Sequence, residues 1–126
     1  MAIELNHTIL ATRDPRETAA FYSEVLGLPE SESYGPFLVL RLSNSVSLDI
    51  LREDGEVTSQ HYAFLVTEGE FDEIFARLQG RGQQYWADPF HEEPGRVNNW
   101  YGGRGVYFLD PSGHRLEIMT RPYGSS

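Results

Sequence analysis

The stretch GVYFLDPSGHRLEIMT, residues 105–120, contains two segments typical of β-strands on either side of a turn. Residues 105–109 and 115–120 are rich in β-branched, aromatic and aliphatic side chains, and the segment Pro111–Gly113 between them favours a turn. The second segment is interrupted by Glu117, which lies between a leucine and an isoleucine. A carboxylate among such neighbours is costly to bury unless it is paired or bound to a metal, so Glu117 is a candidate functional residue.

The residues before this stretch predict the other elements of the same half of the chain. Gln60–Val66 has the composition of a strand, and the capping box Thr67–Glu70 begins a helix whose apolar stripe ends near Gly80. Gln84–Trp86 favours a further short strand. After it comes a loop, residues 87–103, rich in proline, glycine, asparagine and aromatic side chains. A loop of this length in a compact domain is usually functional or mobile.

The first half of the chain predicts the same order of elements. Asp14 suits the N-cap of a helix, Pro15 its first position, and Glu17 completes a capping box. Gly27 suits the C-terminal cap of that helix. The expected elements of this half are a strand within residues 2–12, a helix from Asp14 to Gly27, and strands near 30–34, 37–42 and 46–51.

The two halves also place polar residues at matching points. His7 and His61 lie on the first strand of each half, 54 residues apart, and Asp49 and Glu117 lie on the last strands. Internal repetition of this kind is a fold-level signal. The sequence therefore predicts an α+β fold, a single domain of residues 1–126 that consists of two βαβββ modules, about 1–56 and about 57–122.

These matching residues have the chemistry of a metal site. If the two halves pack around a pseudo-twofold axis, His7, His61 and the two carboxylates of Asp49 and Glu117 converge on one concave sheet. Two imidazoles with one or two carboxylates suit Fe(II), Mn(II), Co(II), Ni(II) or Zn(II). Such a set leaves positions on the metal open to substrate or water. A solvated surface position remains the simpler interpretation for each residue taken alone.

Several other side chains have both a structural and a functional interpretation. His91 lies in the long loop, where an exposed polar residue is the simpler reading, and His114 is expected to cap the turn before it. The aromatic residues in and beside the loop could line an apolar pocket or pack beneath the loop; they are Trp86, Phe90, Trp100 and Tyr101. Surface exposure is the simpler interpretation for the arginines that could bind an anionic substrate, Arg41, Arg96 and Arg104.

Composition excludes several classes of chemistry. The chain has no cysteine, which excludes disulfides, thiolate metal sites and cysteine nucleophiles. All ten basic residues are arginine, so Schiff-base chemistry on lysine is excluded as well. A net charge of −9 disfavours nucleic acid and anionic membranes as partners. Because the first residues also lack a signal-peptide pattern, we expect a cytoplasmic protein with no nucleic-acid or membrane partner.

Three runs of the sequence resemble the vicinal oxygen chelate superfamily, which includes glyoxalases, bleomycin resistance proteins and extradiol dioxygenases. They are NHTILATRDPRETAAFYSEVLGL (6–28), HYAFLV (61–66) and GGRGVYFLDPSGHRLEIMT (102–120), and the similarity extends from about Glu4 to Tyr123. The resemblance implies paired modules that form an incomplete mixed β-barrel around a metal and substrate site, usually in a homodimer. It also implies that His7, His61 and Glu117 bind the metal, with Asp49 where glyoxalase I has a fourth, glutamate ligand.

The resemblance leaves two enzymatic readings open. Tyr107–Glu117 fits the second half of the extradiol dioxygenase signature, but asparagines and a tryptophan, residues 98–100, stand where that signature has a histidine. HYAF and YFLDPSGHRLE are also similar to fosfomycin thiol-transferases. Those enzymes have a hydroxyl residue where this chain has Ile9, and a lysine in the stretch where it has Ala87. Both departures argue against fosfomycin as a substrate.

A third reading is a bleomycin-type resistance protein that sequesters an aromatic, cationic drug without chemistry. The acidic surface and the aromatic loop suit such a ligand. Sequestering members of the superfamily generally lack the metal ligands, however, and His7, His61 and Glu117 stand in those positions here.

We therefore expect a metal-dependent enzyme, of lyase, isomerase, transferase or dioxygenase type, acting on a small oxygenated molecule. Its two vicinal oxygens, or an enediolate, would chelate a divalent Fe, Mn, Ni, Co or Zn ion. Asp49 is a possible fourth ligand or general base, and Tyr107 a possible proton donor. The loop over residues 87–103 would form a lid or a pocket wall.

Overall fold

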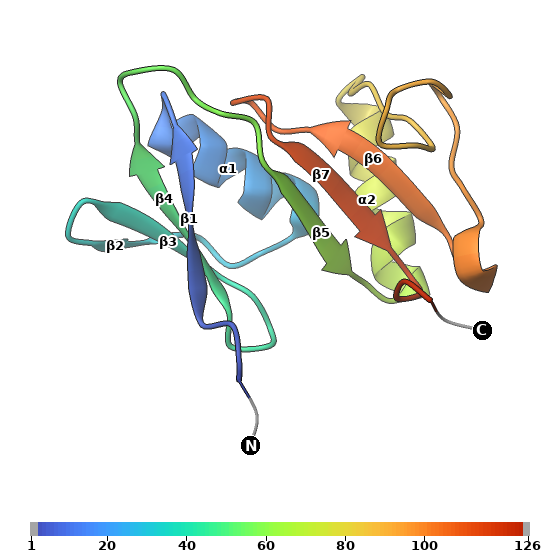
Figure 1. Cartoon of the computed structure of the whole chain (residues 1–126), viewed down its shortest axis with the longest axis horizontal. Helices are drawn as coiled ribbons and strands as arrows, with labels where there is room; N and C mark the ends of the chain where they lie inside the picture. Colours follow the sequence, from blue (N-terminus) through green and yellow to red (C-terminus); the bar gives the residue numbers. More distant parts are fainter. Residues whose placement is uncertain (1–2, 125–126) are drawn as a thin grey trace. The chain divides into compact units, whose positions relative to one another are not determined.

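The computed structural model describes residues 3–124, which form two compact units that meet in sequence at Thr58 and Ser59. Each unit contains one mixed β-sheet and one α-helix that covers a single face of that sheet (Figure 1). The α+β class predicted from the sequence is confirmed. We call the face turned away from the helix the distal face of each sheet.

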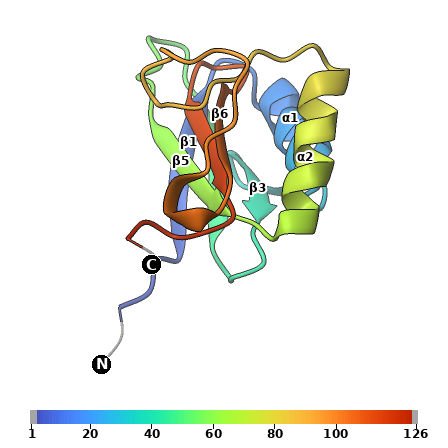
Figure 2. The same cartoon turned by 90° about the vertical axis from the view of Figure 1, so that its right-hand side faces the viewer.

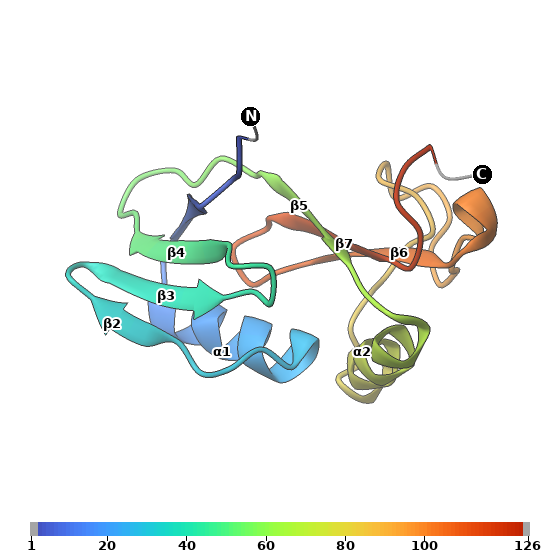
Figure 3. The same cartoon turned by 90° about the horizontal axis from the view of Figure 1, so that it is seen from below.

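The first unit has a four-stranded sheet in the order β1-β4-β3-β2. β1 and β4 are parallel, whereas β3 is antiparallel to both of its neighbours. Helix α1 packs against one face (Figure 3), where Leu10, Leu40, Leu48 and Ile50 are buried. Its elements are β1 (His7–Thr12), α1 (Pro15–Leu26), β2 (Glu32–Tyr34), β3 (Phe37–Arg41) and β4 (Ser47–Arg52).

The second unit has a three-stranded sheet in the order β5-β7-β6, with β5 parallel and β6 antiparallel to β7. Helix α2 covers one face of this sheet (Figure 2), and its Phe71, Ile74 and Leu78 are buried. The elements are β5 (His61–Leu65), α2 (Glu68–Gly80), the short 3-10 helix η1 (Trp100–Gly102), β6 (Gly105–Leu109) and β7 (Arg115–Met119).

The predicted capping residues begin both helices, with one difference. At α2, Thr67 Oγ1 accepts from the backbone N–H of Glu70 at 3.1 Å, and the Glu70 carboxylate accepts from the N–H of Thr67 at 2.8 Å. At α1, Asp14 accepts from the N–H of Glu17, but its own N–H donates to Thr12 Oγ1 at 3.3 Å. The capping box predicted there is therefore only half formed. No helix in the described range is long and apolar enough to cross a membrane.

Two of the predicted strands differ from those in the structure. The first strand begins only at His7, and Leu5 before it is 68% exposed. Helix α2 ends at Gly80, as predicted, and the chain turns away at Gly82, which has a left-handed φ of 66°. In the predicted strand 84–86, only Trp86 is paired, through isolated bridges. One of these bridges joins Trp86 to β6, so this residue anchors the long loop to the sheet without extending it.

Candidate active site

A buried carboxylate and a histidine lie together on the distal face of the second unit. Glu117 on β7 is 1% exposed, and its Oε1 lies 3.2 Å from Nε2 of His61 on the neighbouring strand β5. The parallel register pairs Glu117 with Ala63, two residues after His61, so both side chains lie on the same face. The His61 side chain remains 44% exposed, which keeps one side of this pair accessible to solvent.

Two tyrosines complete the surroundings of Glu117. Tyr107 is directly opposite Glu117 on β6 and is 2% exposed. Tyr123, after the last strand, donates from its hydroxyl to Glu117 Oε1 at 3.2 Å. Burial raises the pKa of the Tyr107 phenol above its ordinary value, and a hydrogen bond to Tyr123 and the charge of Glu117 raise it further. Tyr107 is therefore a neutral hydrogen-bonding phenol at physiological pH.

Aromatic rings surround this group. His61 and Trp100 both contact the Tyr107 ring, each with a centroid distance of 6.1 Å. Trp100 and Tyr101 of η1 are 41% and 44% exposed. Segments from the long loop and the C-terminus lie on the side of the sheet opposite α2 (Figure 3). The small hollow that they enclose is lined by Asn98, Trp100, Tyr101, Arg104, Glu117, Met119, Arg121 and Tyr123.

The first unit carries the other predicted site residues on its own distal face. His7 begins β1, and Asp49 on β4 is paired in register with Ile9, which is 50% exposed. His7 Nδ1 lies 2.7 Å from Asn6 Oδ1, so in the neutral ring Nδ1 donates and Nε2 is the acceptor. Asp49 Oδ1 accepts from Ser47 Oγ at 2.8 Å.

The His61–Glu117 pair has the donor chemistry for a divalent metal. An imidazole nitrogen and a carboxylate oxygen within hydrogen-bond distance on one face form part of the donor set that first-row divalent ions accept. Among residues 3–124, no three histidine and carboxylate side chains are grouped closely enough to hold an ion within the structure as it stands. The predicted third ligand, His7, belongs to the first unit.

The remaining histidines have structural roles. His114 is fully buried, and its Nδ1 accepts from the backbone N–H of Gln60 at 3.0 Å, which fixes the start of β5. Its role is larger than the predicted cap of the turn, because its ring also packs edge-on against Tyr62. His91 stacks on Trp86 with a centroid distance of 3.7 Å and an interplanar angle of 8°.

Buried polar side chains hold the long loop in place. Asp88 accepts from the backbone N–H groups of Phe90, Glu92 and Glu93 at 2.8–3.1 Å. Burial works against its charge, but these hydrogen bonds keep the pKa of Asp88 below its ordinary value. Asn98 donates to the carbonyl of Ala87 at 2.7 Å. Asn98, one of the three residues at the positions where the dioxygenase signature has a histidine, thus helps to hold the loop in place.

The arginines that could bind an anionic substrate have other partners where their contacts are defined. Arg104 forms ion pairs of 2.8 Å with Glu68 and with Asp72 of α2, and its guanidinium lies 4.3 Å from the Phe71 ring centroid. This clamp, which the sequence did not reveal, ties β6 to α2. Arg41 lies 3.7 Å from Glu32 across exposed strands.

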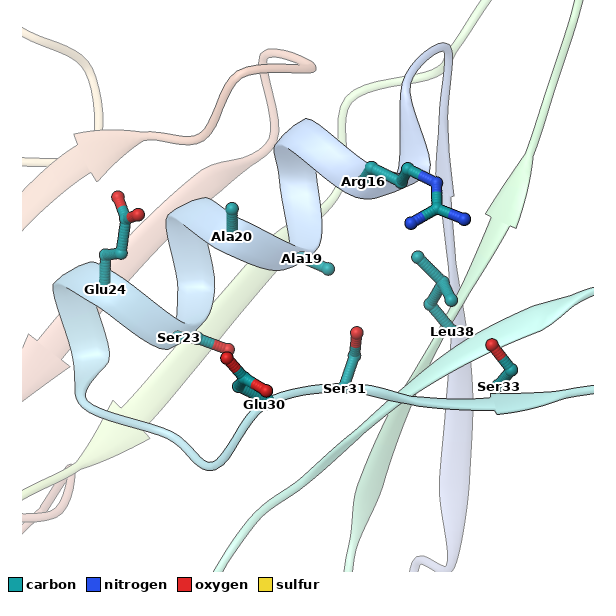
Figure 4. Close-up of a pocket in the computed structure, with 9 residues that line it drawn as sticks. All are labelled: Arg16, Ala19, Ala20, Ser23, Glu24, Glu30, Ser31, Ser33 and Leu38. Atoms are coloured by element: carbon teal, nitrogen blue, oxygen red, sulfur yellow. The ribbon is translucent and has the colours of Figure 1, made fainter.

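A larger hollow, of about 320 Å³, lies in the first unit on the side of α1 (Figure 4). It is on the sheet face opposite His7 and Asp49 and contains no histidine, so it does not have the donors of the predicted metal site. Its lining residues are Arg16, Ala19, Ala20, Ser23, Glu24, Glu30, Ser31, Ser33 and Leu38.

The sequence matches one protein family over most of its length. The family model of the Glyoxalase/Bleomycin resistance protein/Dioxygenase superfamily matches residues 4–118, and the chain belongs to this superfamily. The match includes both histidine-bearing strands and β7 with Glu117. The family resemblance predicted from the sequence is therefore confirmed.

Individual relatives differ in their chemistry. The chain is 32% identical to the glutathione transferase FosA of Serratia marcescens over 94% of this chain and 81% of that one. It is 30% identical to the metallothiol transferase FosB of Lysinibacillus sphaericus over 92% and 81% of the two chains. Among solved structures, the oxidase ChaP-H2 is 54% identical, with a TM-score of 0.97 over 99% of this chain and 98% of that one. The glyoxalase-like fold predicted from the sequence is confirmed by the structure of the lactoylglutathione lyase from Agrobacterium tumefaciens, which has a TM-score of 0.67 over 92% of each chain at 20% identity.

Proposed function

We propose that this protein is a metal-dependent enzyme of the superfamily, acting on a small oxygenated molecule that binds a divalent metal through two adjacent oxygens. His7, His61 and Glu117 are the proposed metal ligands. The proposal extends to a homodimer, which the family resemblance implies, and to a cytoplasmic enzyme, which the sequence predicts. The observation that supports it most is the contact of 3.2 Å between His61 Nε2 and Glu117 Oε1.

The environment of Glu117 supports a role beyond packing. A carboxylate that is 1% exposed loses most of its hydration and needs compensating partners. Among the defined contacts, the partners are a histidine and the hydroxyls of two tyrosines, Tyr123 and Tyr107. Imidazole and carboxylate are the donors that first-row divalent ions bind in open catalytic sites.

The other groups of the site have roles that follow from their contacts. A bound divalent ion would supply Lewis-acid polarisation of the substrate oxygens. Tyr107, a buried neutral phenol beside Glu117, is the proposed proton donor. Trp100 and Tyr101 expose aromatic surface beside Glu117 and can orient a flat substrate. Asp49 remains a possible fourth ligand or general base.

Among the possible reactions, we favour an oxidase. The likeness to ChaP-H2, an oxidase, extends over nearly the whole of both chains at 54% identity, whereas the thiol transferases are 30–32% identical. Ile9 also exposes half of its apolar surface beside Asp49, where fosfomycin enzymes have a hydroxyl. A thiol-transferase reaction on a substrate other than fosfomycin is the second candidate, supported by the relatives FosA and FosB.

Metal content is the direct test. We expect the protein, purified without an affinity tag, to carry on the order of one Fe, Mn, Ni, Co or Zn ion per chain, and His61→Ala to lose it while the fold survives. His91→Ala is the matched control, because His91 stacks on Trp86 in the same unit without contacting Glu117. Iron together with oxygen uptake on catechol-like compounds would support the oxidase.

Other outcomes would redirect the proposal. Nickel or zinc with turnover of a thiol and an epoxide would support the transferase. Stoichiometric metal retained in His61→Ala would exclude His61 as a ligand. A protein that binds none of these ions after reconstitution would instead favour the drug-sequestering function, which binding of aromatic cations would then test.

A further inference from the structure

The segment after β7, residues 120–124, folds back over Glu117, and we call it the C-terminal arm. Its first residue is fixed to the strand β6 side of the sheet: Thr120 N–H donates to the carbonyl of Arg104 at 2.9 Å, and Arg104 N–H donates to Thr120 Oγ1 at 2.8 Å. Two reciprocal hydrogen bonds set the direction in which the arm leaves the sheet.

A glycine allows the arm to approach closely. Gly103 is buried, and a Cβ atom at this position would overlap Cγ of Arg121 and lie 2.6 Å from Thr120 Oγ1. Both of these atoms belong to the arm, and they are held near the backbone by the Thr120 hydrogen bonds. Any side chain at residue 103 would therefore displace the arm.

The same arm delivers Tyr123 to the site. The Tyr123 ring lies 6.0 Å from the ring of Tyr101, which adopts a left-handed φ of 58° in η1. From this position the Tyr123 hydroxyl donates to Glu117 Oε1 at 3.2 Å. Three separate features, the Thr120 hydrogen bonds, the clearance at Gly103 and the Tyr101 contact, thus converge on one hydrogen bond to the buried carboxylate.

We propose that Tyr123 is a positioning residue that holds the Glu117 carboxylate in the orientation in which it binds the metal. This inference rests on the proposed function. A hydroxyl bonded to Oε1 restricts the rotation of the carboxylate and leaves other lone pairs for a cation. Partners of this kind orient metal ligands, and their removal typically weakens metal binding about 10–100-fold.

The first test removes one oxygen atom. Tyr123→Phe keeps the ring and its contact with Tyr101 but loses the hydroxyl. Titration of Mn(II) and of Zn(II) into metal-free protein, in competition with a chelator, should show binding at least about tenfold weaker than in the wild type. The matched control is Tyr34→Phe, because Tyr34 is 75% exposed on β2 in the first unit. Circular dichroism checks that both variants are folded.

A second test moves the arm without altering Tyr123 or Glu117. Gly103→Ala introduces the Cβ that overlaps Arg121 and should weaken metal binding in the same direction as Tyr123→Phe. Gly69→Ala is its control, because a Cβ there meets nothing within 4 Å. Combining Gly103→Ala with Tyr123→Phe should then weaken binding little more than either change alone, since both remove the same hydrogen bond.

The results separate this inference from the proposed function. A wild-type protein that binds neither of these ions, nor Fe(II), Ni(II) or Co(II), would overturn both. Tight binding by the wild type together with equal binding by Tyr123→Phe would overturn only the positioning role. Tighter binding by Tyr123→Phe would also overturn it, because the hydroxyl would then compete with the metal for Glu117.

Discussion

The two units place a histidine and a carboxylate at the same strand positions, yet they surround them differently. In each unit, the histidine is the first residue of the first strand. A parallel strand pairs with it, and the carboxylate lies on that strand two residues after the histidine's partner in the register. In the second unit, Glu117 is buried and contacts His61 and Tyr123. In the first, Asp49 is half-buried and bonds to Ser47, and His7 contacts Asn6.

The difference comes from chain that lies outside the repeated elements. In the first unit, short turns connect β2, β3 and β4. In the second, the long loop supplies Trp100 and Tyr101, and the C-terminal arm supplies Tyr123, to the surroundings of Glu117. The extra methylene of a glutamate also lets its carboxylate reach further from the strand than that of an aspartate. The repeated strands thus determine where the histidine and the carboxylate lie in each unit. The segments outside the repeat determine which side chains surround them.

The core residues should respond alike in the two units, and these changes have the largest expected effect on stability. Ile50 and Ile118 follow the two carboxylates on β4 and β7, and both are fully buried on the helix side. Ile50→Ala and Ile118→Ala should each lower the free energy of unfolding by about 2–5 kcal/mol. Urea denaturation measures both. The matched packing would be contradicted if one variant lowered the free energy of unfolding by less than about 1 kcal/mol while the other lowered it by about 2 kcal/mol or more.

The carboxylates themselves should respond very differently. Glu117→Gln keeps the shape of the side chain but removes the charge, and we expect metal affinity to fall on the order of 100-fold or more, measured by competition with a chelator. Asp49→Asn makes the same change at the matching position of the first unit and, if Asp49 is only structural, should leave the metal content unchanged. A large loss of metal in Asp49→Asn would make Asp49 a ligand or an essential partner of one.

The clamp between β6 and α2 belongs only to the second unit. Arg104→Met keeps much of the apolar side chain but removes the ion pairs with Glu68 and Asp72 and the contact with Phe71. We expect a loss of roughly 1 kcal/mol at low salt and a smaller loss in concentrated salt, which screens exposed charges. Arg52→Met, which removes an exposed pair with Asp54, is the control and should cost less. Equal costs would show that the clamp adds nothing.

Asp88, which anchors the long loop, should make the stability of the protein depend slightly on pH in the acidic range. The folded-state pKa of Asp88 lies below its ordinary value of 3.8, so its charged form stabilises the fold at neutral pH. That contribution is present above pH 3.8 and is lost as the pH falls through the folded-state pKa. Asp88→Asn should therefore melt at a lower temperature at pH 7 and lose less stability on acidification. If the melting temperature of Asp88→Asn falls on acidification as steeply as that of the wild type, this role is contradicted.

The elements of the fold were predictable because their signals are local. The capping residues Asp14 and Thr67, the left-handed cap at Gly27 and the strand-forming composition of β6 and β7 act within a few residues of chain. The predicted strand at 84–86 failed for a non-local reason: only Trp86 meets β6 before the chain bends away. Backbone pairing there depends on the partner segment, which the local sequence does not encode.

The site was predictable in its strand residues and not in its surroundings. Glu117 could be singled out because a carboxylate interrupts an apolar strand, and the structure brings it to His61. Tyr123 gave no such signal, since its contact with Glu117 depends on the path of the C-terminal arm over Gly103. The ion pairs of Arg104 were equally hidden, because they join residues more than 30 positions apart.

The stacking of His91 on Trp86 has an optical consequence. The chain has two tryptophans, Trp86 and Trp100, and both lie in the second unit, where Trp86 also pairs with Tyr107 and Trp100 contacts its ring. Tryptophan emission from this protein therefore comes entirely from the segments around Glu117, while the first unit is silent. The imidazole of His91 lies 3.7 Å from the indole of Trp86, which is close enough to quench the fluorescence of the indole. A movement of the long loop would therefore change the intensity of tryptophan emission.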